Sequence, residues 1–362
     1  MVASFSGLPQ LCCSKTLPAT LWNACSVFAI EDCKKLLSVM GGLKLLALRF
    51  KEIEQLYRSM RLIRRVEEEI ALIYPSDKIK SPIHLSIGQE AISSGVCAAL
   101  SSDDVISASY RCHAAYLAHG GSLEGMLAEL FGKSTGVAGG KAGSMHLIDM
   151  SHNILGASAV VGTTIPVALG YAMAMQREGK GRVVVAFFGD GATEEGVFAE
   201  CLNFASLKKL PILFVCENNG YAINTPTSKR WATDRLIERV ATYGIPATLI
   251  EDGDVIKTYE ATVDALSAIR NRQGPAFFEC KIYRWREHVG PNEDYDDGYR
   301  TRDELENWQK KDQIPLLGEM LAKTDRERID GEIEEALIAA FAFAENSPFP
   351  APEEISNDVF AK

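Results

Sequence analysis

Residues 182–196 read RVVVAFFGDGATEEG. An apolar, β-branched run that ends in glycine is typical of a buried parallel strand, so we expect a strand over Arg182–Phe188. Asp190 then lies at the carboxyl end of this strand. Pro211–Cys216 is a second run of this kind, and the apolar spacing within Thr193–Lys208 predicts a connecting helix. The stretch therefore predicts a βαβ unit, which is the repeating element of an α/β fold with a doubly wound parallel sheet.

Two oxygen-bearing side chains, Asp190 and Asn219, follow the two predicted strands and lie 29 positions apart. Because open α/β sheets bind ligands at the carboxyl ends of their strands, both side chains are expected at one site. A carboxylate, an amide oxygen and a backbone carbonyl would fill half of the octahedron that Mg²⁺ prefers, leaving the rest to a diphosphate and water. Gly189-Asp190-Gly191 or Asn218-Asn219 alone would indicate only a turn. Their joint placement predicts a magnesium ion that holds a diphosphate.

The rest of the chain continues this alternation of helices and strands. We expect further strands over Val105–Ser109, Ala247–Ile250 and Pro275–Tyr283. We expect helices over Leu48–Ile73, within His84–Leu100, and over Ile165–Glu178, Val255–Asn271 and Asp330–Glu345. Glycine is dense between Gly132 and Gly162, which predicts a long ordered loop that wraps a ligand.

The domain boundaries follow from this pattern. With 362 residues, 47% of them hydrophobic, the chain can bury one large core, and we place one domain at residues 49–345 with a tail at residues 346–362. Residues 1–48 read as a poorly ordered or misannotated extension without a function, with Met40 as a plausible true start. They lack the arginines of a presequence, and the uncharged run 16–30 is too short to cross a bilayer.

The bulk composition excludes several classes of protein. A net charge of −10 opposes a nucleic-acid partner, since nucleic acids are normally bound by a basic face. Nine cysteines without a Cys-x-x-Cys pair indicate reduced thiols, and we expect a cytoplasmic protein with no membrane anchor. Cys97, Cys201 and Cys216 fall in apolar runs and are expected in the core.

Several further motifs accompany the predicted metal site. They are HLSIGQEA at 84–91, YR at 110–111, GGKAGSMH at 139–146, VGTTIP at 161–166 and YRWREH at 283–288. With these motifs in this order, residues 50–304 resemble the α-subunit of the heteromeric thiamine-diphosphate-dependent 2-oxo-acid dehydrogenases, the family of pyruvate, branched-chain and acetoin dehydrogenases. The resemblance implies a doubly wound α/β domain of the diphosphate-binding type, with thiamine diphosphate and Mg²⁺ as cofactors.

The resemblance also implies roles for individual residues. Asp190, Asn219 and the backbone carbonyl of Tyr221 would hold Mg²⁺. The other cofactor contacts would come from the amides of Gly191 and Ala192, from Tyr110 and Arg111 at the diphosphate, from Ala159 and Val161 at the aminopyrimidine ring, and from Ile223 as an apolar support. His84 and His288 would touch the diphosphate region and transfer protons. His146 is open between packing and catalysis, and Ser158, Thr163 and Thr164 fall where some relatives bind a monovalent cation.

The reaction implied is oxidative decarboxylation of a 2-oxo acid, or cleavage of acetoin, with acyl transfer to a lipoyl carrier. A non-oxidative decarboxylase or carboligase with the same cofactor, and a non-catalytic supporting subunit, stay open as alternatives. A nucleotide-binding module does not fit, because residues 189–196 are not Gly-x-Gly-x-x-Gly and Gly132-Lys133-Ser134 lacks the upstream glycine of a phosphate loop.

The resemblance further implies a separate β-subunit. A second, pyrimidine-binding domain does not fit into the short remainder of the chain after residue 304, so we expect a heterotetramer of two α- and two β-subunits, served by a lipoyl acyltransferase. Val289 stands where the mitochondrial pyruvate enzymes carry a phosphorylatable serine, so this regulation is expected to be absent. The acidic loop Asn292–Asp297 belongs clearly to none of the relatives, and the choice between a 2-oxo acid and acetoin stays open.

Overall fold

The computed structural model describes residues 30–357. The chain divides into two compact units, residues 1–52 and residues 53–362. In the first unit the described backbone belongs to helix α2 (Ile30–Ile73), which starts well before the predicted Leu48. The remainder of the predicted extension, including the run 16–29, lies outside the described residues. The proposed domain boundaries stay predictions.

The second unit is built on a sheet of six parallel strands in the order β2-β1-β3-β4-β8-β7. The strands are β1 (Val105–Ser109), β2 (Ile154–Ser158), β3 (Val184–Gly189), β4 (Ile212–Asn218), β7 (Ala247–Ile250) and β8 (Ala276–Lys281). A two-stranded antiparallel ribbon, β5 (Tyr221–Ala222) with β6 (Thr225–Pro226), follows β4. The α/β fold with a parallel sheet is therefore confirmed.

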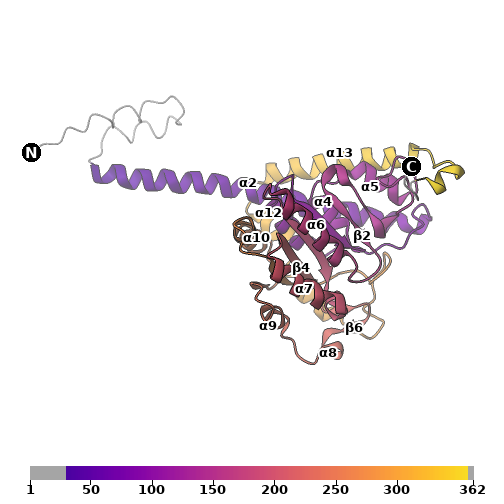
Figure 1. The fold of residues 1–362 in the computed structure, drawn as a ribbon. Coiled ribbons are helices and arrows are strands. Elements are labelled where there is room, and N and C mark those ends of the chain that lie inside the picture. The colour runs from indigo at the N-terminus through magenta and orange to yellow at the C-terminus, as the bar shows by residue number, and fades with distance from the viewer. Residues whose placement is uncertain (1–29, 358–362) are drawn as a thin grey trace, which may run out of the picture. The chain divides into compact units, whose positions relative to one another are not determined.

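Helices cover both faces of the sheet, because successive strand residues point to opposite sides and both sides are apolar. On β3, Val185 and Phe187 pack into one core and Val184 and Phe188 into the other. The first core is covered by α2, α3 (Glu90–Ala98), α4 (His113–Ala118), α5 (Leu123–Leu130), α10 (Val255–Arg270) and α13 (Lys323–Asn346). The second is covered by α6 (Thr164–Glu178), α7 (Gly196–Lys208) and α9 (Leu236–Ala241). Because helices cover both faces, the sheet is doubly wound. Figure 1 shows that, within the first of these layers, α13 runs alongside α5.

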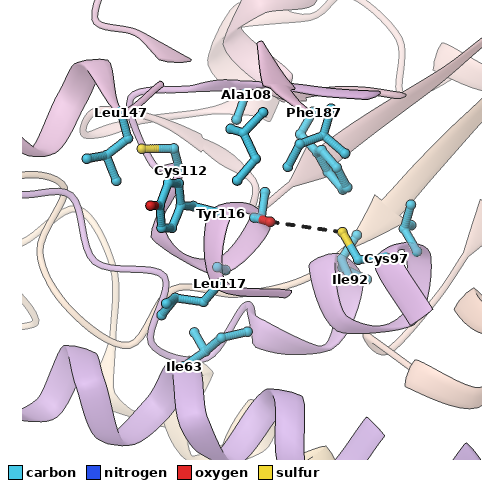
Figure 2. Close-up of a cluster of buried hydrophobic side chains, with 14 of the residues drawn as sticks. Ile63, Ile92, Cys97, Ala108, Cys112, Tyr116, Leu117, Leu147 and Phe187 are labelled. Carbon is cyan, nitrogen blue, oxygen red and sulfur yellow. Dashed lines mark hydrogen bonds between the residues drawn. The ribbon is translucent and has the colours of Figure 1, made fainter. Parts of the chain in front are cut away.

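The first core is continuous from α2 to the sheet. Figure 2 shows the side chains of Ile63 and Tyr116 in one cluster with Ala108 of β1 and Phe187 of β3. Cys97 belongs to this cluster, and its thiol donates to the backbone oxygen of Ala115 at 4.0 Å. Cys201 and Cys216 are also buried, so the predicted core positions of all three cysteines are confirmed.

The strand order creates a crevice between β1 and β3. From β1 the chain moves to β2 on one side, and it then returns to form β3 on the other side. The carboxyl ends of β1 and β3 therefore border a topological switch point, where doubly wound sheets bind ligands. Ser109 ends β1 and is followed by Tyr110 and Arg111, while Gly189 ends β3 and is followed by Asp190.

One predicted element was wrong. The segment from Gly132 to Gly162 is not a single loop, because its end forms the edge strand β2, with two short 3-10 turns before it. Its glycine-rich first part wraps an internal group, the carboxylate of Glu129, which is fully buried. Four backbone N–H groups donate to this carboxylate at 2.6–3.1 Å, from Ala138, Gly140, Ala142 and Gly143.

Other boundaries differ by smaller amounts. The last long helix, α13, begins at Lys323 instead of the predicted Asp330. It is preceded by two short helices that the sequence analysis did not identify, α11 (Arg302–Gln309) and α12 (Gln313–Glu319). None of the described helices is both long and apolar enough to cross a membrane.

Candidate active site

A cavity of about 290 Å³ opens at the switch point. Its lining includes most of the residues that the motifs predicted, namely Tyr110, Arg111, Val161, Asp190, Gly191, Ala192, Asn219, Tyr221, Ile223 and His288. Two predicted contacts do not line it. His84 packs against Tyr110 with 4.4 Å between the ring centroids, and Ala159 directly precedes the lining residues Val160 and Val161. His146 is exposed and lies outside the lining.

The cavity also includes residues that the sequence analysis did not assign. They are Gln89, Ser109, Val160, Gly162, Phe188, Gly189, Glu194, Glu195, Glu217 and Ala222. Several were within reach of the sequence argument, because Gln89 belongs to the 84–91 motif and Ser109 is the last residue of a predicted strand. Thr164, one of the three residues assigned above to a monovalent cation, also lines the cavity. Ser158 and Thr163, the other two residues assigned to a monovalent cation, do not line the cavity. The hydroxyl of Thr163 donates to that of Ser158 at 3.2 Å.

Asp190 and Asn219 bring two oxygen donors to the cavity, and they are only 1% and 9% exposed. Two hydrogen bonds orient the Asn219 amide. Its Nδ2 donates to Gln89 Oε1 at 3.0 Å, and its Oδ1 accepts from the backbone N–H of Tyr221 at 3.1 Å. Because Gln89 holds the nitrogen of the amide, the amide oxygen is turned away from Gln89.

Asp190 has a counter-charge, Arg230, which is the last residue of α8 (Thr227–Arg230). Arg230 donates from Nη2 to the Asp190 carboxylate and also pairs with Glu194. Its Nε donates to the backbone oxygen of Thr225 at 3.0 Å. Burial raises the pKa of Asp190, and Arg230 opposes this rise. A buried carboxylate needs a cation beside it to stay ionised, so the place next to Asp190 suits a cation.

Ile223 has a strained backbone at the cavity. Its φ of 53° lies in the left-handed region, which costs a β-branched residue about 1–2 kcal/mol. Its side chain is nevertheless 59% exposed, so packing does not explain the strain. The carbonyl of Ile223 accepts from Arg284 at 3.0 Å, and Arg284 is fully buried against Asp294. Strain that neighbouring residues hold in place is typical of a ligand contact.

Three rings cluster at the edge of the cavity. The ring centroids of His84 and His288 are 5.1 Å apart, and those of Tyr110 and His288 are 5.7 Å apart. Arg111 connects the two histidine segments by donating to the backbone oxygens of Leu85 at 2.6 Å and His288 at 3.2 Å. Its Nη2 also lies 3.5 Å from His288 Nδ1. Because a guanidinium only donates, Nδ1 is the acceptor, and the proton of neutral His288 is on Nε2.

Both histidines are neutral near pH 7. Burial, with the charge of Arg111 second, lowers the pKa of His84 to about 3 and that of His288 to about 3. Burial also raises the pKa of Glu217, to about 7. His84 Nδ1 is buried and has no hydrogen-bond partner within the described part of the chain, which leaves it for a ligand or water.

The cavity has a polar part and an apolar part. Asp190, Asn219 and Arg111 line the first, and Val161, Phe188 and Ile223 line the second. A Cβ on Gly191 would lie only 3.2 Å from the Ala222 side chain, so glycine keeps this wall open. The described residues contain no group of three or more His, Cys, Asp or Glu side chains suited to a metal. A metal held by one carboxylate, an amide and ligand oxygens would be a hard cation such as Mg²⁺.

Comparisons with known proteins agree with this geometry. Residues 58–353 match the family described as "Dehydrogenase E1 component". The chain is 36% identical over 310 residues to the alpha subunit of acetoin:2,6-dichlorophenolindophenol oxidoreductase from Bacillus subtilis, covering 84% of this chain and 92% of the relative. It is 35% identical over 317 residues to the pyruvate dehydrogenase E1 component subunit alpha of Zymomonas mobilis, covering 85% and 88%.

A plant relative is similar to the same degree. The chloroplastic pyruvate dehydrogenase E1 component subunit alpha-3 of Arabidopsis thaliana is 36% identical over 320 residues, which cover 85% of this chain and 74% of the relative. The family match, residues 58–353, includes the switch-point cavity and both histidine segments. The chain therefore belongs to the dehydrogenase E1 component family, as an α-subunit.

Proposed function

We propose that this chain is the α-subunit of a thiamine-diphosphate- and Mg²⁺-dependent enzyme that cleaves a 2-oxo acid or acetoin and transfers the acyl group to a lipoyl carrier. One observation carries the proposal. Asp190, Asn219 and His288 come from three separate segments and line one cavity. The family implies thiamine diphosphate, and the names of the relatives include acetoin or pyruvate.

The polar part of the cavity is the proposed metal and diphosphate site. We assign Mg²⁺ to Asp190, Asn219 and the carbonyl of Tyr221. The dication would take the place of Arg230 on Asp190. Gln89 holds the amide nitrogen of Asn219, so the amide oxygen, which accepts one hydrogen bond from Tyr221, keeps a lone pair for the metal. The amides of Gly191 and Ala192, with Tyr110 and Arg111, would bind the diphosphate.

The apolar part is the proposed site for the rings. Val161 and Ile223, with the backbone of Ala159, would hold them in the water-excluded orientation that the reaction needs. Bound thiamine diphosphate supplies a nucleophilic carbon and an electron sink for breaking the bond next to a carbonyl. The chain's own contribution is to bind the cofactor, to exclude water and to handle protons.

We assign proton transfer to His288 and a supporting contact to His84. Arg111 fixes His288 through Nδ1 and the backbone oxygen, so the proton on Nε2 is the one available to a substrate oxygen. The low pKa of His288 keeps the ring neutral in the free chain, so its Nε2–H can donate a hydrogen bond to a substrate oxygen. The ring of His84 lies beside that of His288, and its Nδ1, which has no partner among the described residues, would contact the bound ligand.

A β-subunit is the proposed partner, in a heterotetramer with two copies of each chain. The support is the apolar part of the cavity lining, where Val160, Val161 and Ile223 are 62%, 41% and 59% exposed and would need cover. A lipoyl acyltransferase is the proposed acceptor of the acyl group. We also place the protein in the cytoplasm, which the free thiols of Cys97, Cys112, Cys201, Cys216 and Cys280 support.

The experiment is reconstitution with the β-subunit. The complex would be assayed with pyruvate and with acetoin, each with and without a free lipoyl domain, in Mg²⁺ and thiamine diphosphate. The proposal predicts acyl-lipoyl product that depends on both cofactors. Carboligation that does not depend on the lipoyl domain would instead establish the non-oxidative alternative, which the comparisons do not support. Equal activity of the chain alone would rule out the need for a β-subunit.

A further inference from the structure

A second cavity, of about 520 Å³, lies at the amino ends of the strands, on the side of the sheet opposite to the switch point. It forms where α6, α7 and α10 end and where β3 and β4 begin. Because β3 spans six residues at about 3.3 Å each, the two cavities lie roughly 20 Å apart. They share no lining residue, so the second cavity is independent of the proposed active site.

The lining of this cavity is strongly cationic. Its charged members are Arg182, Lys208, Lys209, Arg270 and Arg272, with no Asp or Glu among the described lining residues. Arg182 pairs with Glu178 and Arg270 pairs with Asp104, both from outside the lining. Lys208, Lys209 and Arg272 have no carboxylate partner in the part of the chain that the structure describes. In a chain with a net charge of −10, three uncompensated cations in one concavity concentrate a positive field.

Hydrogen bonding to the last helix carbonyls does not explain these cations. Basic residues are often found at helix ends because they satisfy the last carbonyls. Here the ends are closed by other donors: the Gln176 amide donates to the carbonyls of Lys208 and Lys209 at 3.0 and 2.9 Å. At the end of α10, the backbone N–H of Arg272 donates to Ile269 at 2.9 Å. The charged side-chain ends are therefore not needed to close the helices.

Two of the cations also occupy strained positions. Lys209 and Arg272 have φ values of 50° and 60°, in the left-handed region where glycine is favoured. Two other turns of the same cavity do use glycine there, at Gly179 and Gly181, with φ of 73° and 76°. Long cationic side chains at positions that glycine would relax indicate that the charge itself serves a purpose.

We propose that this cavity binds a small organic phosphate of the nucleoside di- or triphosphate class. Lys208, Lys209 and Arg272 match the two or three negative charges of a phosphate chain. Leu207, which is 71% exposed, joins Met175 and Ile269 in an apolar wall for the base. A volume of 520 Å³ is within the ordinary range of ligand pockets, about 300–1,000 Å³.

Calorimetric titration of the full chain tests this, in excess Mg²⁺ and thiamine diphosphate so that the first cavity does not take up the probe. ADP and ATP are expected to bind saturably with one site per chain, and adenosine is not. The double variant Lys209→Gly/Arg272→Gly should weaken ADP binding about tenfold or more, because two phosphate contacts are lost. The same variant should raise the thermal midpoint of the unliganded protein, because glycine relaxes both backbones.

Two control variants complete the design. Asp77→Gly relaxes another left-handed residue, with φ of 62°, outside the cavity and should leave ADP affinity unchanged. Lys209→Arg/Arg272→Lys keeps both charges and should retain binding. The proposal is overturned if neither ADP nor ATP binds saturably, if adenosine binds as tightly as ADP, or if the glycine double variant binds ADP as tightly as the unsubstituted chain.

Discussion

Two glycine-rich loops of this chain are similar in composition and differ in what they surround. The loop at residues 136–143 is closed around Glu129, whose carboxylate accepts four backbone N–H groups. The loop at residues 189–196 is open, since it presents its own carboxylate, Asp190, to a cavity where Arg230 is the counter-charge. Glycine density therefore marks close backbone approach, and the nearby charges decide whether the partner is internal or external.

The open loop has a proposed catalytic neighbour and the closed loop has none, so the largest effect on turnover is expected at His288. His288→Ala should lower turnover about 10²- to 10⁴-fold, the usual contribution of a positioned acid–base group. Thiamine diphosphate affinity should fall little. Turnover per active site and the thermal midpoint would be measured together, and a lower midpoint with unchanged turnover would remove the catalytic role.

His288→Ala should also change how the stability of the fold depends on pH. The pKa of His288 is lowered from 6.5 to about 3 in the folded chain. At a pH between these two values, His288 is protonated in the unfolded chain and neutral in the folded chain. Stability is therefore lost as pH falls from about 6.5 towards 3. His288→Ala should lose less stability over that range, which thermal midpoints at several pH values would measure.

Removing the carboxylate that faces the cavity, Asp190, should affect ligand binding and not folding. Asp190→Ala is expected to weaken Mg²⁺-dependent thiamine diphosphate binding more than about 100-fold, because even the residues behind a metal ligand cost 10–100-fold. The fold should persist, since Arg230 keeps its pair with Glu194. Calorimetric titration of the assembled enzyme gives the affinity, and a value equal to that of the unsubstituted enzyme would refute the metal assignment.

Removing the enclosed carboxylate, that of Glu129, should lower the stability of the fold and not ligand binding. Glu129→Gln replaces one acceptor oxygen by an NH₂ group that faces backbone donors, and it should lower the free energy of unfolding by about 3 kcal/mol. Thiamine diphosphate affinity of the folded fraction should change little. Denaturant unfolding of Glu129→Gln beside Asp190→Ala measures the contrast. The comparison of the two loops fails if both variants lose the same property.

The smallest expected effect is at the residue that orients Asn219. Gln89→Leu should weaken Mg²⁺ binding about 10- to 100-fold, because the Asn219 amide loses its acceptor at 3.0 Å and can turn. Gln89→Glu keeps an acceptor oxygen and is the matched control, with affinity nearer to the original. Electron paramagnetic resonance of Mn²⁺ measures the metal affinity of both variants without an activity assay. Equal losses in both variants would indicate a packing role alone.

The sequence predicted the parts of this architecture that depend on local pattern. Strands β3 and β4 are built on apolar runs, and Asp190 and Asn219 are the first residues after the two strands. Strand β2 was missed because it is a half-buried edge strand that contains Gly156. The roles of Glu129 and Arg230 depend on contacts between segments, and no periodicity or motif in the chain encodes such contacts.

The cation beside Asp190 is expected to be exchangeable: Arg230 in the chain alone, and a divalent ion in the loaded enzyme. A crystal structure of the assembled enzyme with thiamine diphosphate and Mn²⁺ tests this directly through anomalous scattering. We expect a manganese peak bound by Asp190 and Asn219, with Arg230 turned away from the carboxylate. A fully loaded enzyme with no such peak, and with Arg230 still paired with Asp190, would contradict it.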